Sequence, residues 1–346
     1  MTGRTMPGRM MTGRTRRVVT GACLLAVVAL AGIGSEADAG SPPSAAARLV
    51  ASMRTATAQT DFSGEVTVAW RNVDGHLKHS TVDVHAANGV LEVTADGQVV
   101  LDEGGHTFLK DDLGWTSPVS EPTAQHRPSP DMRWRLALHH GTSHDRDVST
   151  VVATRRDGSV AARLVIDDAT HLPLARQVLD VHGRVLRSFE FVTLDLAPGD
   201  VAPVAAAVPS DTSHTATAIG HVPSGYHAPN VAGAGYTLVS RSRHDDGVHL
   251  VYSDGLFTAS VTEQRGELDW DSMPSGGAST DIDGVHARRY VEAAGDVLVW
   301  ERDGVVYTCV SDAPTDVLAS MAAGLTPDRS AVTQVADFVL GPFAFG

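Results

Sequence analysis

The chain has 346 residues, of which 42% are hydrophobic, and a formal net charge of −14. Its length suits one large domain or two modest ones. The acidic balance argues against nucleic acid and anionic lipid headgroups as partners, because both are negatively charged. The sequence has no glycine-rich phosphate loop, no Gly-x-Ser-x-Gly turn and no paired-cysteine metal motif. It therefore predicts no bound nucleotide, cofactor or metal.

Residues 1–39 are predicted to be a secretory signal peptide. A cluster of arginines precedes the apolar run VVTGACLLAVVALAGIG, and small residues up to Ala39 fit a cleavage site before Gly40. The run is at the short end for a membrane span, so a retained anchor is the alternative. We expect an exported, extracytoplasmic protein in the periplasm or cell-envelope space. Its mature part keeps a single cysteine, Cys309, predicted to be a buried hydrophobic residue.

Residues 44–198 are predicted to form the first domain. The segment AAARLVASMRTATAQT has helical periodicity, and Ser44 stands where an N-cap is needed. The period then changes to two, so that Val66, Val68 and Trp70 share one face of a strand. Further alternating runs are separated by Asp-Gly and Asn-Gly pairs, which favour hairpin turns. We expect a helix followed by an antiparallel meander.

The densest group of histidines follows Trp134 in the stretch WRLALHHGTSH. Apolar residues alternate from Trp134 onward, which favours a strand over a short helix. On a strand His139 and His140 point to opposite faces, so they cannot hold one ion together with His144. The spacing is wrong for zinc, and we interpret these histidines as solvated side chains.

The segment RLVIDDATHLPLARQVLD brings together Asp167, Asp168 and His171. Two carboxylates and an imidazole could form an active site or a metal site. Aspartate and threonine also bond to their own backbone and close turns, and this group stands between two strand-like runs. We therefore interpret it as a turn and predict no catalytic residue there.

Beyond this region the composition changes. Residues 199–221 are rich in Ala, Pro, Ser and Thr without periodicity, which predicts a linker. Residues 222–327 are predicted to form a second domain, with six strand-like runs between YTLVSRSR and VVYTCVS and a helix near Asp316. The tail, residues 328–346, has no clear pattern. The predicted fold class is α+β with mostly antiparallel strands.

Several of these segments resemble the MucB/RseB family. In the second domain they are VPSGYHAP at 222–229 and HLVYSDGLFTASV at 249–261. The first domain is similar to that family's N-terminal domain in DFSGEVTV at 61–68 and in DGSVAARLVIDDATHLPLARQVLDVHGRVL at 157–186. The resemblance spans most of the mature chain, but residues 139–148 have no equivalent in the family pattern.

The resemblance implies a larger domain with a curved, unclosed β-sheet and a helix across its concave side, which is the LolA/LolB fold, and a smaller domain of sheet plus helix. Characterised members bind the extracytoplasmic part of a membrane-anchored anti-sigma factor and shield it from proteolysis. They are thought to release it when a lipid-like or envelope-stress ligand is bound. The family brings no catalytic residues, so we expect a regulator and not an enzyme.

The matching motif Tyr252, Ser253, Asp254, Gly255 and Leu256 is the candidate partner-docking site. An alternative function is a lipid or lipoprotein carrier that holds acyl chains on the concave face. The segment LPLARQVL supports that alternative, because its apolar residues fall on both faces of a strand. An enzyme of the envelope is the remaining alternative.

Overall fold

The computed structural model describes residues 42–95, 98–103, 106–111, 114–120, 128–198, 217–244, 247–293 and 295–325. The predicted signal peptide with its cleavage site at Ala39, most of the predicted linker and the tail lie outside these residues. Within them are two antiparallel sheets and two α-helices, so the predicted α+β class is confirmed. None of the helices in this part of the chain is long and apolar enough to span a membrane.

Eleven antiparallel strands form the first sheet, in the order β6-β5-β4-β3-β2-β1-β11-β10-β9-β8-β7. They are β1 (Phe62–Arg71), β2 (Leu77–Ala87), β3 (Val90–Ala95), β4 (Gln98–Glu103), β5 (His106–Asp111), β6 (Gly114–Ser120), β7 (Arg135–Ser143), β8 (Arg146–Thr154), β9 (Val160–Asp167), β10 (Pro173–Leu179) and β11 (Val185–Phe191). Two meanders meet where β1 pairs with β11, with Val66 opposite Phe191. The sheet is open, and β6 and β7 are its edges.

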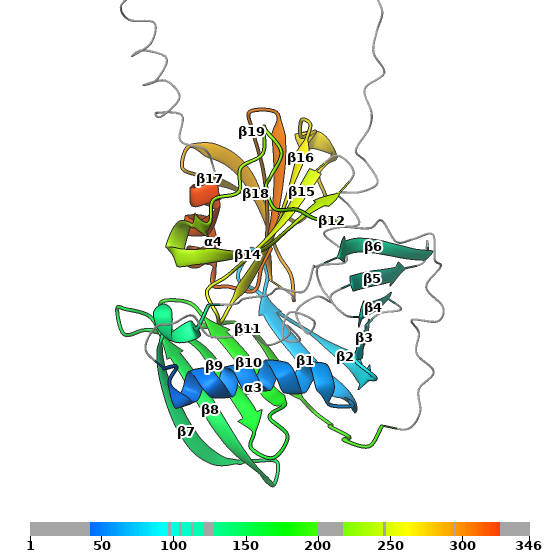
Figure 1. Cartoon of the computed structure of the whole chain (residues 1–346), viewed down its shortest axis with the longest axis vertical. Coiled ribbons are helices and arrows are strands. Elements are labelled where there is room, and N and C mark those ends of the chain that lie inside the picture. Colours follow the sequence, from blue (N-terminus) through cyan, green and yellow to red (C-terminus); the bar gives the residue numbers. More distant parts are fainter. Residues whose placement is uncertain are drawn as a thin grey trace, which may run out of the picture.

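Helix α3 (Ala45–Gln59) runs across the concave face of this sheet, as Figure 1 shows. The Oγ atom of Ser44 accepts a hydrogen bond from the Ala47 amide at 3.1 Å, which confirms the predicted N-cap. The helix buries Val50 and Met53 in the same core as the apolar side chains of the strands, among them Val66. Alternation therefore places one face of each strand against the helix.

The second sheet has the order β12-β14-β15-β16-β20-β19-β18-β17, and β13 also pairs with β14. Its strands are β12 (Thr217–Ala218), β13 (Val231–Ala232), β14 (Tyr236–His244), β15 (Gly247–Ser253), β16 (Thr258–Arg265), β17 (Ala278–Ile282), β18 (Val285–Val291), β19 (Asp296–Arg302) and β20 (Val305–Ser311). Helix α4 (Thr315–Leu325) packs Val317, Leu318 and Met321 into the core. Cys309 is fully buried, as predicted.

All six strands expected in the second sheet are present, together with three that alternation did not indicate. Strands β12 and β13 have only two residues each, and β17 is an edge strand whose side chains are mostly exposed. Short and exposed strands bury little, so they leave no apolar pattern in the sequence. Three short 3₁₀ helices, η2 (Pro130–Met132), η4 (Gly233–Gly235) and η5 (Trp270–Ser272), also lack such a pattern.

Candidate functional site

The predicted turn around Asp167 is confirmed. Asp167 is buried, and its carboxylate accepts hydrogen bonds from the Thr170 amide at 3.0 Å and the Thr170 hydroxyl at 2.6 Å. Arg146 approaches the second carboxylate oxygen at 3.5 Å. Asp168 and His171 are exposed, and His171 takes a left-handed backbone conformation with φ of 60°. The three side chains serve a loop and do not converge on one point.

The histidine-rich stretch forms β7, as predicted. His139 lies opposite Thr150 and His140 opposite Ser149, so the two imidazoles point to opposite faces. His140 exchanges a hydrogen bond with the Ser149 hydroxyl at 2.9 Å. In the part of the chain that the structure describes, no three His, Cys, Asp or Glu side chains are close enough together to hold a metal ion.

The motif Tyr252–Leu256 does not lie on the outer surface, and its Asp254 and Gly255 lie against the first half of the chain. Tyr252 and Ser253 are completely buried, and Asp254 and Leu256 are almost so. The turn after β15 points toward the loop that precedes β7, and a Cβ atom added at Gly255 would lie 2.3 Å from the carbonyl oxygen of Pro128. In this arrangement the side chains of the candidate docking motif are covered by the chain itself and are not accessible to a partner.

Asp254 is the centre of this contact. Its carboxylate accepts hydrogen bonds from the Phe257 amide at 2.8 Å and from the Trp134 indole at 3.0 Å, and Arg133 pairs with it at 3.2 Å. Burial raises the pKa of Asp254, although these hydrogen bonds and Arg133 favour its charged form. The Trp134 ring also packs edge-on against Phe257, with ring centroids 5.5 Å apart.

A second group of ion pairs crosses the same contact. Arg176 of β10 pairs with Asp312 at 2.7 Å and lies over the ring of Phe257. Arg187 of β11 pairs with Asp296 and donates to the carbonyl oxygen of Asp312 at 3.1 Å. Because these charges are buried, each depends on its partner across the contact. The two sheets are therefore held in one relative position by charge pairs as well as by apolar packing.

Sequence reasoning missed these arginines. Arg176 and Arg187 stand inside apolar strands, on the same face as Val178 and Phe189. An arginine on the buried face of a strand needs a buried counter-charge. The presence of arginine at positions where alternation predicts a buried residue was therefore a signal in the sequence. It did not show the partner, because Asp296 and Asp312 lie more than a hundred residues away along the chain.

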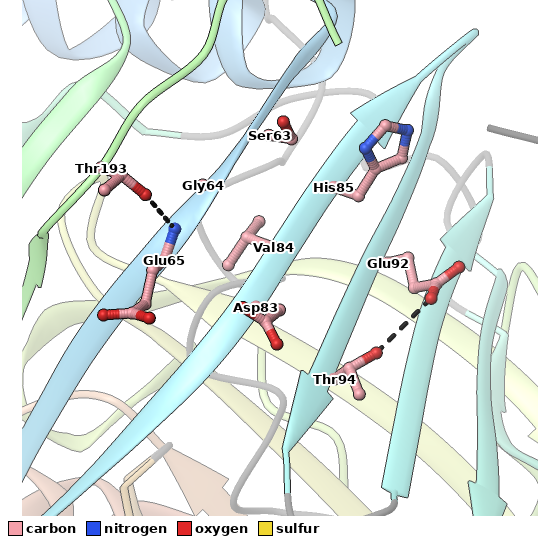
Figure 2. Close-up of a pocket in the computed structure, with 9 residues that line it drawn as sticks. All are labelled: Ser63, Gly64, Glu65, Asp83, Val84, His85, Glu92, Thr94 and Thr193. Atoms are coloured by element: carbon pink, nitrogen blue, oxygen red, sulfur yellow. Dashed lines mark hydrogen bonds between the residues drawn. The ribbon is translucent and has the colours of Figure 1, made fainter. Parts of the chain in front are cut away.

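Two shallow hollows lie on the opposite face of the first sheet, away from α3. The first has a volume of about 400 Å³, and Figure 2 shows the carboxylates of Glu65, Asp83 and Glu92 on three neighbouring strands around it. Glu65 stands directly opposite Asp83 in the strand register, a placement of like charges that is unfavourable. Among the described residues, none of these three carboxylates has an ion-pair partner.

The second hollow, also of about 400 Å³, lies over β8 to β11. Its lining mixes apolar side chains such as Val165 and Ala175 with the charged groups of Arg146, Arg163 and Glu190. The concave face, where the sequence left open a lipid groove, carries the core that includes Met53 of α3. Both hollows described here therefore lie on the face that the helix does not cover.

Solved structures with a similar arrangement were found, whereas no family model and no curated protein matches the sequence. MucB is among them. A chain from the Pseudomonas aeruginosa MucA/MucB complex is 19% identical, with 82% of this chain and 99% of that chain covered and a TM-score of 0.46. A crystal structure of MucB is 19% identical, with 82% and 98% covered and the same TM-score of 0.46. The LolA superfamily protein NE2245 from Nitrosomonas europaea is 13% identical, with 78% and 91% covered and a TM-score of 0.19.

The family that these first two structures represent is the one that the sequence motifs indicated. At identities below 20% and TM-scores below 0.5, the MucB likeness assigns no partner, ligand or activity to this chain. The site that the chain itself presents is the contact between its two sheets. We call this contact the joint. It consists of Asp254 with its partners in the first half, and of the ion pairs Arg176–Asp312 and Arg187–Asp296. It can hold the two sheets in a fixed relative position, and loss of its ion pairs would release them.

Proposed function

We propose that this chain is an exported, non-enzymatic regulator of the MucB/RseB type, which binds the extracytoplasmic part of a membrane-anchored anti-sigma factor. One observation carries the proposal. The motif segments of the two halves touch each other: Arg176, from LPLARQVL, lies over Phe257, from YSDGLF, with the guanidinium 5.2 Å from the ring centroid. Two segments that each resemble the family, from distant parts of the sequence, thus form one joint.

The contact between the two sheets suggests how partner binding and release would be controlled. A regulator of this kind has to hold its partner in one state and release it in another. A joint made of buried ion pairs supports two such states, because the pairs are stable only when both sides are in place. We propose that a lipid-like or other envelope signal acts by loosening this joint. The proposal assigns no catalytic residue, cofactor or metal.

A lipid or lipoprotein carrier is the alternative function, in which acyl chains occupy the concave face of the first sheet. The packing gives this alternative less support. Val50 and Met53 of α3 are buried against the apolar side chains of that face, so an acyl chain would have to displace the helix. The regulator proposal leaves helix α3 in place on the sheet.

Binding to a purified anti-sigma ectodomain tests the proposal. The secreted chain would be titrated onto the immobilised ectodomain of a membrane-anchored anti-sigma factor from the same organism, and the complex exposed to protease. We expect a saturable complex in which the ectodomain is protected, and we expect deletion of this chain to raise one extracytoplasmic sigma-factor regulon. Extraction of fatty acid into solution, without any ectodomain binding, would instead favour the carrier.

A further inference from the structure

Strand β7 is a long edge of the first sheet. Its nine residues, Arg135–Ser143, pair with β8 on one side only. None of the described residues forms a backbone hydrogen bond with its outer side between Leu136 and Ser143. At about 3.3 Å per residue the open edge is about 30 Å long. Most of its side chains are exposed, and Leu136 and Leu138 are half-buried against the core.

The hairpin geometry decides which backbone groups point outward. His144 and Asp145 both have positive φ, at 51° and 59°, so they form a two-residue turn closed by Ser143 and Arg146. In such a hairpin the closing pair is hydrogen-bonded, and the residues that face the partner strand alternate from there. The amide and carbonyl groups that point away from the sheet therefore belong to Leu136, Leu138, His140 and Thr142.

The edge lacks the features that usually keep edge strands from pairing. Its sequence, RLALHHGTS, contains no proline, no lysine and no acidic residue. The register with β8 is continuous from Arg135 to Ser143 without a bulge. A Cβ atom added at Gly141 would meet nothing within 4 Å, so the face of the sheet is open above the strand there. An unprotected strand of this length is a template for another strand.

We propose that β7 binds an extended segment of a partner protein as an additional strand of the sheet, and that this segment is acidic. The charge of β7 is the reason for expecting an acidic segment. Ionisable side chains on β7 are Arg135, His139 and His140, so the strand is free of negative charge in a chain with 41 acidic and 27 basic residues. An acidic strand meets the positive charge of Arg135 and no negative charge on β7, but it meets repulsion over much of the remaining surface.

A second copy of this chain fits the edge less well. Antiparallel pairing of two β7 strands about their centre would set His139 against His139. It would also bring together two chains that each carry a net charge of −14. The proposal rests on the proposed function only for the identity of the partner, whose ectodomain would supply the segment.

Amide hydrogen exchange tests the edge directly. The full secreted chain would be followed by NMR with and without a synthetic peptide in which Val and Thr alternate with Glu. In the free chain we expect fast exchange at Leu136, Leu138, His140 and Thr142, and slow exchange at the residues between them. The peptide should slow the first set only. Slow exchange of that set in the free chain, in proportion to protein concentration, would show self-pairing and overturn the proposal.

A proline at Thr142 gives a second test. The exposed Thr142 points its amide outward, so Thr142→Pro removes one donor to the added strand and leaves the pairing with β8 intact. We expect peptide binding to weaken roughly tenfold. Thr142→Ala, which keeps the amide, is the matched control and should bind as the wild type does. Equal affinity in both variants would refute strand addition.

The two proposals fail in different ways. If the anti-sigma ectodomain binds but protects none of the four outward amides and ignores Thr142→Pro, the edge proposal is wrong and the regulator proposal stands. If the ectodomain does not bind at all, the regulator proposal is wrong, and the Glu-containing peptide still decides whether β7 accepts an acidic strand. A neutral peptide of alternating Val and Thr that binds as tightly would remove the acidic part of the proposal.

Discussion

Asp296 shows how much depends on single residues in the joint between the sheets. Its side chain is completely buried, and it accepts from Arg187 of the first sheet, from Arg289 at 2.8 Å and from the Thr315 hydroxyl at 2.8 Å. A buried carboxylate with three donors is well satisfied, but each donor then relies on its negative charge. We interpret Asp296 as the residue that couples Arg187 to the second sheet.

Replacing Asp296 by asparagine should therefore destabilise the protein strongly. The amide keeps the shape but leaves the Arg187 guanidinium buried without a counter-charge, which costs about 3–5 kcal/mol. Urea unfolding would measure this loss. Asp303→Asn is the control, since that carboxylate is exposed and pairs with Arg302 at 3.7 Å, so the change should cost less than about 1 kcal/mol. Similar costs for the two variants would contradict the assignment.

Glu263 is a second buried acid, away from the joint. Its side chain is fully buried in the second sheet, and one oxygen accepts from the His227 amide at 2.9 Å. The other oxygen has no partner among the described residues. Burial raises its pKa to about 7, while the His227 amide acts in the opposite direction. The folded protein thus holds this proton more tightly than the unfolded chain does.

The stability of the protein should consequently depend on pH through Glu263. The pKa of Glu263 in the folded protein lies above the ordinary value of 4.5, so protonation of this side chain stabilises the folded state relative to the unfolded chain. This stabilisation is lost as the pH rises from 4.5 through about 7. The loss is up to about 3 kcal/mol at pH 8. Glu263→Gln stays neutral and can still accept from His227. Urea unfolding at pH 5 and pH 8 measures this dependence. The free energy of unfolding of the variant should rise relative to that of the wild type between pH 5 and pH 8. The same difference between the two proteins at both pH values would contradict the role of Glu263.

At the scale of elements, the turn between β15 and β16 decides how the sheets meet. Asp254 closes it through the amides of Leu256 and Phe257, and Ser253 accepts from the Gly255 amide. Gly255 has φ of 87°, in the region that favours glycine, and it touches the loop before β7. The turn therefore needs glycine for two reasons, its conformation and its closeness to the first sheet.

A comparison of Gly255→Ala with Gly284→Ala distinguishes the cost of the backbone conformation from the cost of the contact with the first half. Both glycines have positive φ, but a Cβ at Gly284 meets nothing within 4 Å, whereas at Gly255 it meets backbone of Pro128 and Pro130. Gly284→Ala should cost only the backbone strain, about 1–2 kcal/mol. The Gly255 variant should cost at least about 1 kcal/mol more, as the added methyl forces the sheets apart. Thermal unfolding of the two variants measures the difference, and equal melting temperatures would show that the contact is loose.

For the molecule as a whole, the joint makes the two sheets one cooperative structure. The main core includes side chains of both sheets, such as Val66 of the first and Leu250 of the second, and buried ion pairs cross between them. Separation of the sheets would expose this surface and leave unpaired charges. We therefore expect neither sheet to unfold while the other stays folded.

Unfolding followed at two tryptophans tests this cooperativity. Trp70 belongs to β1 of the first sheet, and Trp300 is completely buried in the second. With fluorine-labelled tryptophan, the native signals of both should disappear at the same urea concentration. In the Gly255→Ala variant the two transitions should move apart, because the joint is weakened. Separate transitions in the wild type would mean that the sheets are independent domains.

Much of this architecture could be predicted from the sequence, because its signals are local. Period-two alternation and Asp-Gly or Asn-Gly turns indicate the strands, and Ser44 with a helical pattern indicates α3. The turn at Asp167 follows from the local bonding habits of Asp and Thr. These features depend on neighbours in the chain, so a single sequence contains them.

Only the tertiary structure decided what joins the two sheets and which surfaces stay open. The pairing of Arg187 with Asp296 links two residues that are 109 positions apart in the chain, and no local pattern encodes such a contact. The same holds for Asp254 and Gly255, whose motif is visible in the sequence but whose contacts with Trp134 and Pro128 are not. The open edge of β7 also depends on strand order, because alternation shows that a strand exists and not which strands lie beside it.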